Sequence, residues 1–247
     1  KNEMVRFGLI GKNIGYSFSK EYFNEKFKKM RKKYSYENFD IAHVNQINEI
    51  LENNKKLKGL NVTVPYKESV IPFLDDLDKE SSAIGAVNTI KIDKKKRMIG
   101  YNTDHYGFAM AISDYLPVKN KKAIVLGSGG SSKAVQFVLK MMSFDTLVVS
   151  RKKSKSTITY DRLDEKIISS HHLIVNCTPL GTFPNIHEYP HIPYKYIGKN
   201  HLLFDLTYNP QISGFMEIGM IQGAKVSNGY NMLIFQAEKS WKIWNSK

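Results

Sequence analysis

Short apolar runs alternate with amphipathic segments along the whole chain. In the first half, strand-like runs occupy residues 4–10, 36–41, 59–64 and 86–92. In the second half, strand-like runs at 122–126, 145–149, 172–176 and 202–206 alternate with helical patterns at 130–142, 161–169 and 211–222. Strands that alternate with helices are typical of βαβ units, so the pattern predicts an α/β protein with mostly parallel sheets.

Four large side chains in the first half recur at helical spacing. They are Phe23, Phe27, Met30 and Tyr34. The spacing places them on one face of a helix, and we expect them to be core residues rather than a binding surface.

Two helical segments lie outside the two alternating series. One is expected from about 105 to 116, where Pro117 stops it, and we interpret it as a hinge element between the series. The other is the final stretch, 231–244, whose helical spacing is approximate but uninterrupted. We expect this last helix to return to the first domain.

Composition favours a globular protein of a reducing compartment. The hydrophobic fraction is 42%, and apolar runs such as 123–126 are far shorter than the roughly 20 residues of a membrane-spanning helix. The single cysteine, Cys177, cannot form an intrachain disulfide, and no signal-peptide pattern stands at residues 4–10. We therefore expect a cytoplasmic protein with no membrane partner.

The charge is strongly basic. Lys and Arg number 37 against 23 acidic residues, for a formal charge of +14. The basic residues are mostly lysines scattered over turns, whereas base reading and bidentate phosphate contacts favour arginine. We therefore expect no nucleic-acid partner, although a nucleic-acid-binding protein is the competing interpretation from another class. The charge also attracts anionic small molecules.

A glycine-rich loop follows the run at 123–126. It reads GSGGSSKA from Gly127 to Ala134 and leads into a helix, with Ser132 where the commonest fingerprint has its third glycine. Glycines let the backbone approach a ligand closely, and N–H groups at a helix start favour negative charge. This strand, loop and helix predict a dinucleotide pyrophosphate site.

The next strand ends in a basic turn. Arg151 and Lys152 follow it, and no acidic residue lies between Asp145 and Asp161. An NAD site favours a carboxylate near this strand end, whereas the 2′-phosphate of NADP requires a cation. The turn therefore favours NADP, with a solvated basic turn as the alternative interpretation.

Polar side chains gather at strand ends in the first half. Asn61, Thr63 and Lys67 stand toward the carboxyl end of the run at 59–64, where open α/β sheets bind ligands. Two more polar turns follow, at 85–89 and 100–104. These segments supply neutral donors, one cation and one carboxylate, which suits a polyhydroxylated anionic substrate beside a hydride carrier.

Ser17 and Ser19 precede the first expected helix. They could cap it, or they could bind a substrate carboxylate together with the amides of the helix start. The residues alone favour the cap.

The motifs together resemble the shikimate dehydrogenase family over nearly the whole chain. The motifs are SFS (17–19), NVTVPYK (61–67), GAVNT (85–89), YNTD (101–104), GSGGSSKA (127–134), NCTPLG (176–181), DLTYNP (205–210) and NGYNMLIFQ (228–236). The resemblance implies two α/β domains, one for substrate and a Rossmann-type one for NADP, joined by hinge helices with the active site in the cleft. The expected bounds are 1–103 with 229–247 for the substrate domain and 104–228 for the NADP domain.

The same resemblance implies residue roles. Lys67 and Asp104 would be the catalytic pair. The substrate shikimate, or 3-dehydroshikimate, would be held by Ser17, Ser19, Asn61, Thr63, Asn88, Tyr208 and Gln236. The cofactor would contact Gly127, Gly129, Gly130, Ser131, Arg151, Lys152, Thr178, Gly229 and Met232. The implied reaction is NADP-dependent, needs no metal, and belongs to the shikimate pathway to chorismate and the aromatic amino acids.

The sequence departs from the family's pattern at a few positions. Lys20, Ser150 and Thr182 replace the usual Pro, Asn and Met, and the segment 152–169 is shorter than usual. The three substitutions leave the chemistry intact, whereas the shorter segment indicates a trimmed helix in the cofactor domain and bears on the adenine contacts. A quinate/shikimate dehydrogenase with relaxed cofactor choice and a catalytically silent NADP sensor are the remaining alternatives, and a monomer or a homodimer is expected.

Overall fold

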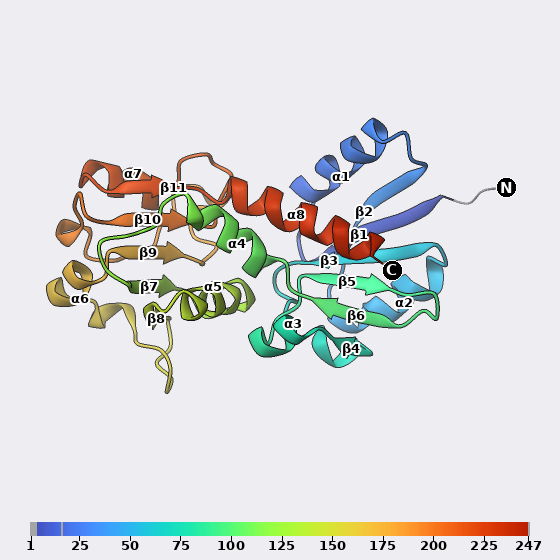
Figure 1. Cartoon of the computed structure of the whole chain (residues 1–247), viewed down its shortest axis with the longest axis horizontal. Coiled ribbons are helices and arrows are strands. Elements are labelled where there is room, and N and C mark those ends of the chain that lie inside the picture. The colour runs from blue at the N-terminus through green and yellow to red at the C-terminus, as the bar shows by residue number, and fades with distance from the viewer. Residues whose placement is uncertain (1–3, 16, 247) are drawn as a thin grey trace. The chain divides into compact units, whose positions relative to one another are not determined.

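The computed structural model describes residues 4–15 and 17–246, which divide into two compact units. The first unit comprises the chain up to Thr103 together with the segment from Ala237 onward, and the second unit comprises Asp104–Gln236. Each unit contains one β-sheet (Figure 1). The fold class predicted from the sequence, an α/β protein with two α/β domains, is confirmed.

The sheet of the first unit has six strands in the order β2-β1-β3-β5-β6-β4. The strands are β1 (Val5–Gly11), β2 (Tyr34–Asp40), β3 (Leu57–Val62), β4 (Asp76–Leu77), β5 (Thr89–Ile92) and β6 (Met98–Tyr101). β1 pairs in parallel with β2 and β3, and β4 pairs in parallel with β6, whereas β5 runs antiparallel to both β3 and β6. The sheet is therefore mixed but mostly parallel.

An aromatic core packs on one part of this sheet. The helices of the first unit are α1 (Phe18–Lys29), α2 (Ile47–Asn53), α3 (Lys79–Ile84) and the second half of α8 (Tyr230–Asn245). Phe7 of β1 lies 5.5 Å from Phe27 of α1 and 4.9 Å from Trp244 of α8, measured between ring centroids. These ring contacts join both helices to the sheet.

The single helical face expected from Phe23 to Tyr34 is only half correct. Phe23 and Phe27 are buried in α1, but Met30 is 40% exposed. The backbone turns at Arg31, whose φ is 52°, so Tyr34 begins β2 instead of extending the helix. Its ring nevertheless joins the same core, 5.5 Å from that of Phe27.

The sheet of the second unit has five parallel strands in the order β11-β10-β9-β7-β8 (Figure 1). Its strands are β7 (Lys122–Leu126), β8 (Asp145–Val149), β9 (Leu173–Asn176), β10 (Leu202–Asp205) and β11 (Lys225–Ser227). Its helices are α4 (Asp104–Ser113), α5 (Gly130–Met141), α6 (Glu165–Ser170), α7 (Gly214–Ile221) and the first half of α8. The strand order reverses between β7 and β9, which is the topological switch point where doubly wound sheets bind ligands.

Successive residues of β7 face two different cores. Ala123 and Val125 pack in a cluster with residues of α4 and α5, whereas Ile124 and Leu126 pack in a cluster with residues of α6 and α7. All four are fully buried. A parallel strand covered on both faces produces the continuous apolar run seen in the sequence.

Residues 229–236 lie with the second unit, whereas the sequence placed them with the substrate domain. Gly229 N–H donates to the Thr207 carbonyl at 2.9 Å, and a Cβ at Gly107 of α4 would lie 2.5 Å from the Met232 carbonyl. These close backbone approaches attach the first half of α8 to the loop after β10 and to α4. No helix among the described residues is both long and apolar enough to cross a membrane.

Candidate active site and nucleotide loop

The glycine loop occupies the turn between β7 and α5. Gly127 has a φ of +104°, in the region that favours glycine, and its N–H donates to the Val149 carbonyl at 2.8 Å. Gly129 is the N-cap of α5, and a Cβ built on it would meet nothing within 4 Å. The first N–H groups of a helix have no intrahelical acceptor, so Gly130 and Ser131 begin α5 beside open space. This arrangement fits a pyrophosphate.

The loop after β9 lies against the glycine loop at the switch point. Cys177 N–H donates to the Leu126 carbonyl at 2.9 Å, and a Cβ at Gly127 would lie 3.4 Å from Thr178 Cγ2. Asn176 Oδ1 accepts from the Thr178 N–H at 3.1 Å and from its hydroxyl at 2.7 Å. The structure thus brings Thr178 next to the glycine loop, as a shared cofactor site requires.

Arg151 and Lys152 follow β8 and are both exposed. Ser150 Oγ accepts from the Lys152 N–H at 3.3 Å and lies 3.5 Å from Ser128 Oγ. The basic turn is therefore adjacent to the glycine loop. Burial raises the pKa of Tyr160, and the charge of Arg151 offsets part of that shift.

Asp205 is a buried carboxylate to which the sequence analysis gave no role. It accepts from Ser213 Oγ at 2.5 Å, from the Thr207 N–H at 2.9 Å and from Asn176 Nδ2 at 3.1 Å. Burial raises its pKa, and these hydrogen bonds act in the opposite direction. Because Asn176 in turn holds Thr178, Asp205 fixes the loop after β9 from the end of β10. In the sequence, only its position in the DLTYNP motif indicated that Asp205 has a role.

The remaining predicted residues of the second unit lie after β10 and on α8. Tyr208 is half-buried, and a Cβ at Gly229 would collide with the Leu206 carbonyl. Met232 is buried in the core with residues of α4 and α5. Gln236 is 8% exposed, and Gly107 allows α4 to approach it, since a Cβ there would lie 3.1 Å from Gln236 Cβ.

In the first unit, a tight turn after β3 carries Lys67. Tyr66 anchors this turn, because its buried hydroxyl donates to the Ile41 carbonyl at 2.7 Å. The Lys67 carbonyl accepts from the Val87 N–H at 2.7 Å, and its side chain is half-buried. Thr63, also half-buried, donates its N–H to the Ile10 carbonyl at 2.9 Å. Lys67 therefore lies in the turn that follows the carboxyl end of β3.

The two polar turns predicted separately are joined by direct hydrogen bonds. Asn88 Nδ2 donates to Thr103 Oγ1 at 2.9 Å, and the Thr103 N–H donates to Asn88 Oδ1 at 2.6 Å. Val62 N–H donates to the Asn88 carbonyl at 2.8 Å, which connects the same turn to β3. Asn61 is 5% exposed and lies in this cluster too. Asp104, also 5% exposed, is the first residue of α4 and of the second unit.

The two serines occupy different environments. Ser17 is the N-cap of α1, and its hydroxyl accepts from the Lys20 N–H at 3.4 Å. Burial raises the pKa of Tyr36 well above its usual value, and the Ser19 side chain acts in the opposite direction. The capping interpretation therefore applies to Ser17, while Ser19 lies near Tyr36, whose hydroxyl donates to Asn61 Oδ1 at 2.8 Å.

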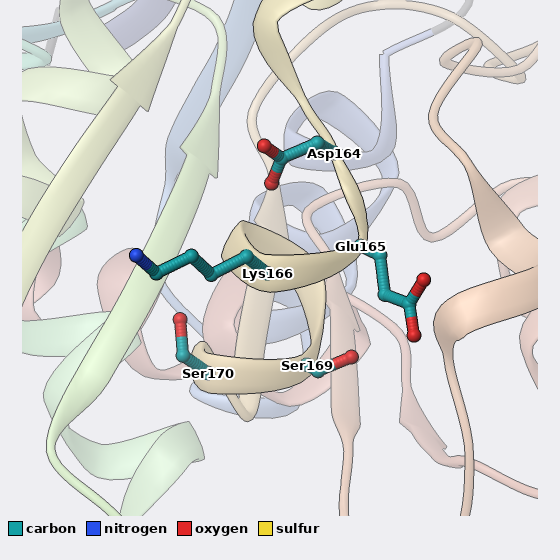
Figure 2. A pocket seen from close by; sticks show the side chains of 5 residues that line it. All are labelled: Asp164, Glu165, Lys166, Ser169 and Ser170. Carbon is teal, nitrogen blue, oxygen red and sulfur yellow. The ribbon is translucent and has the colours of Figure 1, made fainter.

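Each unit has a shallow hollow on its surface, lined by described residues. The one in Figure 2 is lined by Asp164, Glu165, Lys166, Ser169 and Ser170 of α6 and its N-cap. Asp164 accepts from the Ile167 N–H at 2.8 Å as the cap, and Glu165 and Lys166 extend to opposite sides of the helix (Figure 2). None of the predicted site residues lines it. The second hollow is lined by Gly15, Ser17, Lys20, Glu21, Asn24, Glu25, Lys28 and Asn38. Within residues 4–15 and 17–246, His, Cys, Asp and Glu side chains form no group that could hold a metal ion.

Comparison with known proteins identifies relatives along nearly the whole chain. The family model described as the shikimate dehydrogenase substrate binding domain matches residues 9–90, all within the first unit. The shikimate dehydrogenase (NADP(+)) of Clostridium botulinum (strain Hall) is 39% identical over 252 residues, which cover 98% of this chain and 96% of the relative.

Two solved structures have the same fold over nearly their whole length. Shikimate dehydrogenase 1 from Peptoclostridium difficile has a TM-score of 0.87 and 36% identity, with 98% of this chain and 91% of that chain covered. Shikimate 5-dehydrogenase from Thermus thermophilus, solved with NADP(H) and shikimate, has a TM-score of 0.86 and 27% identity, with 98% and 94% covered. The resemblance stated from the motifs is confirmed, and the chain belongs to the shikimate dehydrogenase family.

Proposed function

We propose that this chain is an NADP-dependent shikimate dehydrogenase that reversibly reduces 3-dehydroshikimate to shikimate, on the pathway to chorismate and the aromatic amino acids. The observation that carries the proposal is the near full-length match to the Clostridium botulinum NADP(+) enzyme. The glycine loop at the switch point and the polar cluster after β3 support it from geometry.

The second unit would hold the cofactor. Amides of Gly127, Gly129, Gly130 and Ser131 would bind the pyrophosphate, because the loop has open space at Gly129. Arg151 and Lys152, exposed after β8, would bind the 2′-phosphate. Further cofactor contacts would be Thr178, Gly229 and Met232. When bound, NADPH supplies the hydride.

The first unit would contribute most of the substrate contacts, and the family model for a substrate binding domain matches it. Ser17 and Ser19 would hold the carboxylate through their hydroxyls. The ring hydroxyls would bind Asn61, Thr63 and Asn88, with Tyr208 and Gln236 as further contacts. We propose the substrate domain to be 1–103 with the C-terminal segment, and the NADP domain to begin at Asp104.

Lys67 and Asp104 would perform the proton chemistry. As the C3 carbonyl carbon receives a hydride, its oxygen gains charge and takes a proton from the Lys67 ammonium, which becomes a neutral amine. The Asp104 carboxylate would accept a hydrogen bond from the resulting hydroxyl and orient the ammonium. In the reverse direction, the Lys67 amine takes the hydroxyl proton as the hydride leaves.

Three further properties belong to the proposal. The chain would act on small molecules as a monomer or a homodimer, without nucleic acid or membrane. It would work in the cytoplasm, and a sequence with one cysteine, which cannot form an intrachain disulfide, is compatible with that reducing compartment.

The test is a turnover assay with the purified chain. Shikimate with NADP⁺ should give NADPH, followed by its absorbance, and 3-dehydroshikimate with NADPH should give the reverse reaction. NAD⁺ should support a much lower rate at equal concentration, and quinate should be a poorer substrate than shikimate. Absence of turnover with shikimate and either cofactor would contradict the proposal, and a preference for quinate or NAD⁺ would replace it with the quinate/shikimate alternative.

A further inference from the structure

The second half of α8 places a hydroxyl inside the polar cluster of the first unit. Ser240 Oγ lies 3.1 Å from Asn61 Nδ2, 2.7 Å from Thr89 Oγ1 and 3.1 Å from Thr103 Oγ1. Ser240, Thr89 and Thr103 are fully buried. We call these three residues the hydroxyl cluster, and all of them belong to the first unit.

The hydroxyl cluster contacts the nitrogen of the Asn61 side-chain amide. Asn61 Nδ2 donates to the Asn88 backbone carbonyl at 3.2 Å and to Thr89 Oγ1 at 3.1 Å, in addition to Ser240. A backbone carbonyl can only accept, so the nitrogen of the amide must face the cluster. The oxygen then faces the opposite way, where it accepts from the Tyr36 hydroxyl at 2.8 Å.

Tyr36 extends this orientation toward Ser19. The Tyr36 hydroxyl donates to Asn61 Oδ1, and the Ser19 side chain lowers the pKa of Tyr36 in part, against the larger effect of burial. The direction of donation is thereby fixed from Tyr36 through Asn61 to the hydroxyl cluster. A carboxamide oxygen has two lone pairs, and the bond from Tyr36 uses one, so Asn61 Oδ1 can accept from a substrate hydroxyl as well.

The same cluster reaches the second predicted amide. Thr89 Oγ1 donates to Asn88 Oδ1 at 3.2 Å, and Thr103 bonds both ends of the Asn88 amide. Ser240 Oγ contacts both threonine hydroxyls. Thr89 therefore joins the amides of Asn61 and Asn88 directly, and Ser240 contacts Asn61 together with both threonine hydroxyls, from a helix remote from them in sequence.

We propose that Ser240 is a positioning residue for substrate binding, which acts by holding the amides of Asn61 and Asn88 in the orientation that meets the substrate hydroxyls. The inference rests on the proposed function and deepens it. Ser240 acts through Asn61 and the two threonines, so its loss should weaken substrate binding with little change in turnover at saturation. Cofactor binding, assigned to the second unit, should be unaffected.

The test compares Ser240→Ala with a matched control, Ser81→Ala. Ser81 is also fully buried in the first unit, and its hydroxyl donates to the carbonyls of Gly100 at 3.0 Å and Asp78 at 3.2 Å, outside the hydroxyl cluster. Both variants should lose thermal stability. Only Ser240→Ala should raise the KM for shikimate, by about threefold to tenfold, which is the scale of one net hydrogen bond. The KM for NADP⁺ should stay constant in both.

Unchanged KM for shikimate in a folded Ser240→Ala variant would overturn the inference, and so would an equal rise in Ser81→Ala. A second pair covers the case in which Ser240→Ala does not fold. Thr89→Val removes the neighbouring hydroxyl without changing the shape, and Thr89→Ser restores it. The KM for shikimate should rise in the valine variant and recover in the serine variant, whereas equal values in both would contradict the inference.

The same measurements separate this inference from the proposed function. If wild-type protein does not oxidise shikimate, the function fails and the role of Ser240 fails with it. If wild-type protein is active and the hydroxyl variants retain the wild-type KM, only the role of Ser240 is overturned.

Discussion

At the scale of single residues, we propose that cofactor choice depends on Arg151. This side chain is exposed after β8, where its guanidinium could pair with a 2′-phosphate. Arg151→Ala should weaken NADP⁺ binding by about 1.5–3 kcal/mol, the scale of a charge-assisted hydrogen bond, and should barely change NAD⁺ binding. The dissociation constants of both cofactors, measured by titration, provide the comparison.

Arg162→Ala is a suitable control for this variant, because Arg162 is equally basic and its side chain is 72% exposed beside Asp161. It should leave both dissociation constants unchanged. An equal loss of NADP⁺ and NAD⁺ binding in Arg151→Ala would show that Arg151 supports the fold or the pyrophosphate instead.

Ser17 and Ser19 carry two competing roles. The Ser17 hydroxyl caps α1, so the double alanine variant should lose about 1 kcal/mol of stability in any case. If both hydroxyls also bind the substrate carboxylate, the KM for shikimate should rise while that for NADP⁺ stays constant. Thermal unfolding and steady-state kinetics on the same protein distinguish the two roles.

Asp78→Ala serves as the matched cap deletion, since Asp78 caps α3 and accepts from the Ser81 N–H at 2.8 Å. It should reduce stability without changing the KM for shikimate. If the double serine variant also lost stability with an unchanged KM for shikimate, the proposed binding of the substrate carboxylate by Ser17 and Ser19 would be contradicted.

At the scale of elements, the contact between α4 and α8 depends on Gly107. A Cβ there would lie 2.5 Å from the Met232 carbonyl and 3.2 Å from the Gln236 N. Gly107→Ala should therefore lower the free energy of unfolding by about 1–3 kcal/mol, even though alanine is the better helix former by about 1 kcal/mol. Denaturant unfolding measures this change.

Gly129→Ala is the informative counterpart, because a Cβ at Gly129 meets nothing within 4 Å. It should cost about 1 kcal/mol or less in stability, because glycine is preferred to alanine at an N-cap, yet raise the KM for NADP⁺ by occupying the space assigned to the pyrophosphate. Wild-type stability in Gly107→Ala would contradict the packing, and wild-type cofactor affinity in Gly129→Ala would contradict the loop assignment.

The sequence predicted the elements of the second unit better than those of the first. The bounds of β7 and β8 agree with the predicted 122–126 and 145–149, because strands buried on both faces have continuous apolar runs between polar turns. The short elements β4 (Asp76–Leu77), β6 (Met98–Tyr101) and α3 (Lys79–Ile84) were not predicted. These elements are stabilised by tertiary pairing, such as that of β6 with β5. Each is too short for its sequence to show a helical or strand periodicity, so the sequence could not predict it.

Within the candidate site, residues of contiguous motifs could be predicted from the sequence, whereas residues that contact the site from remote segments could not. The GSGGSSKA loop could be predicted as a pyrophosphate site from the sequence because strand, glycines and helix are contiguous. Asp205 and Ser240 give no such signal, since their partners, Asn176 and Asn61, are far away in the chain. Only the fold shows that Asp205 contacts Asn176 and that Ser240 contacts Asn61.

At the scale of the whole molecule, His172 should make stability depend on pH. Burial lowers its pKa, and the charges of His201 and Lys119 act in the same direction, as does His171, while a hydrogen bond to the Ser169 backbone opposes them. The unfolded chain therefore takes up a proton near the usual histidine pKa of about 6.5 that the folded chain does not. Stability should be unaffected by His172 above that pH and should fall as the pH falls from about 7 toward 5.

His172→Gln should reduce this pH dependence, as measured by the melting temperature across that range. His187→Gln, which alters an exposed histidine, should leave the wild-type profile in place. If His172→Gln and the wild type lose the same stability between the two ends of the range, His172 is not the group responsible.

Lys67 is proposed to carry the proton when this chain oxidises shikimate with NADP⁺, and one kinetic comparison tests this role most directly. Lys67→Ala should fold, bind NADP⁺ normally and lose turnover by about 10²–10⁴, because the amine is needed for a proton that moves only as the hydride does. Asp104→Asn should also be slow, and the double variant should lose much less than the product of the single effects, since the two groups act as one unit. The decisive quantity is the turnover number of Lys67→Ala relative to wild type with saturating shikimate and NADP⁺. A ratio within the predicted range supports the account, and near-normal turnover of Lys67→Ala would contradict it.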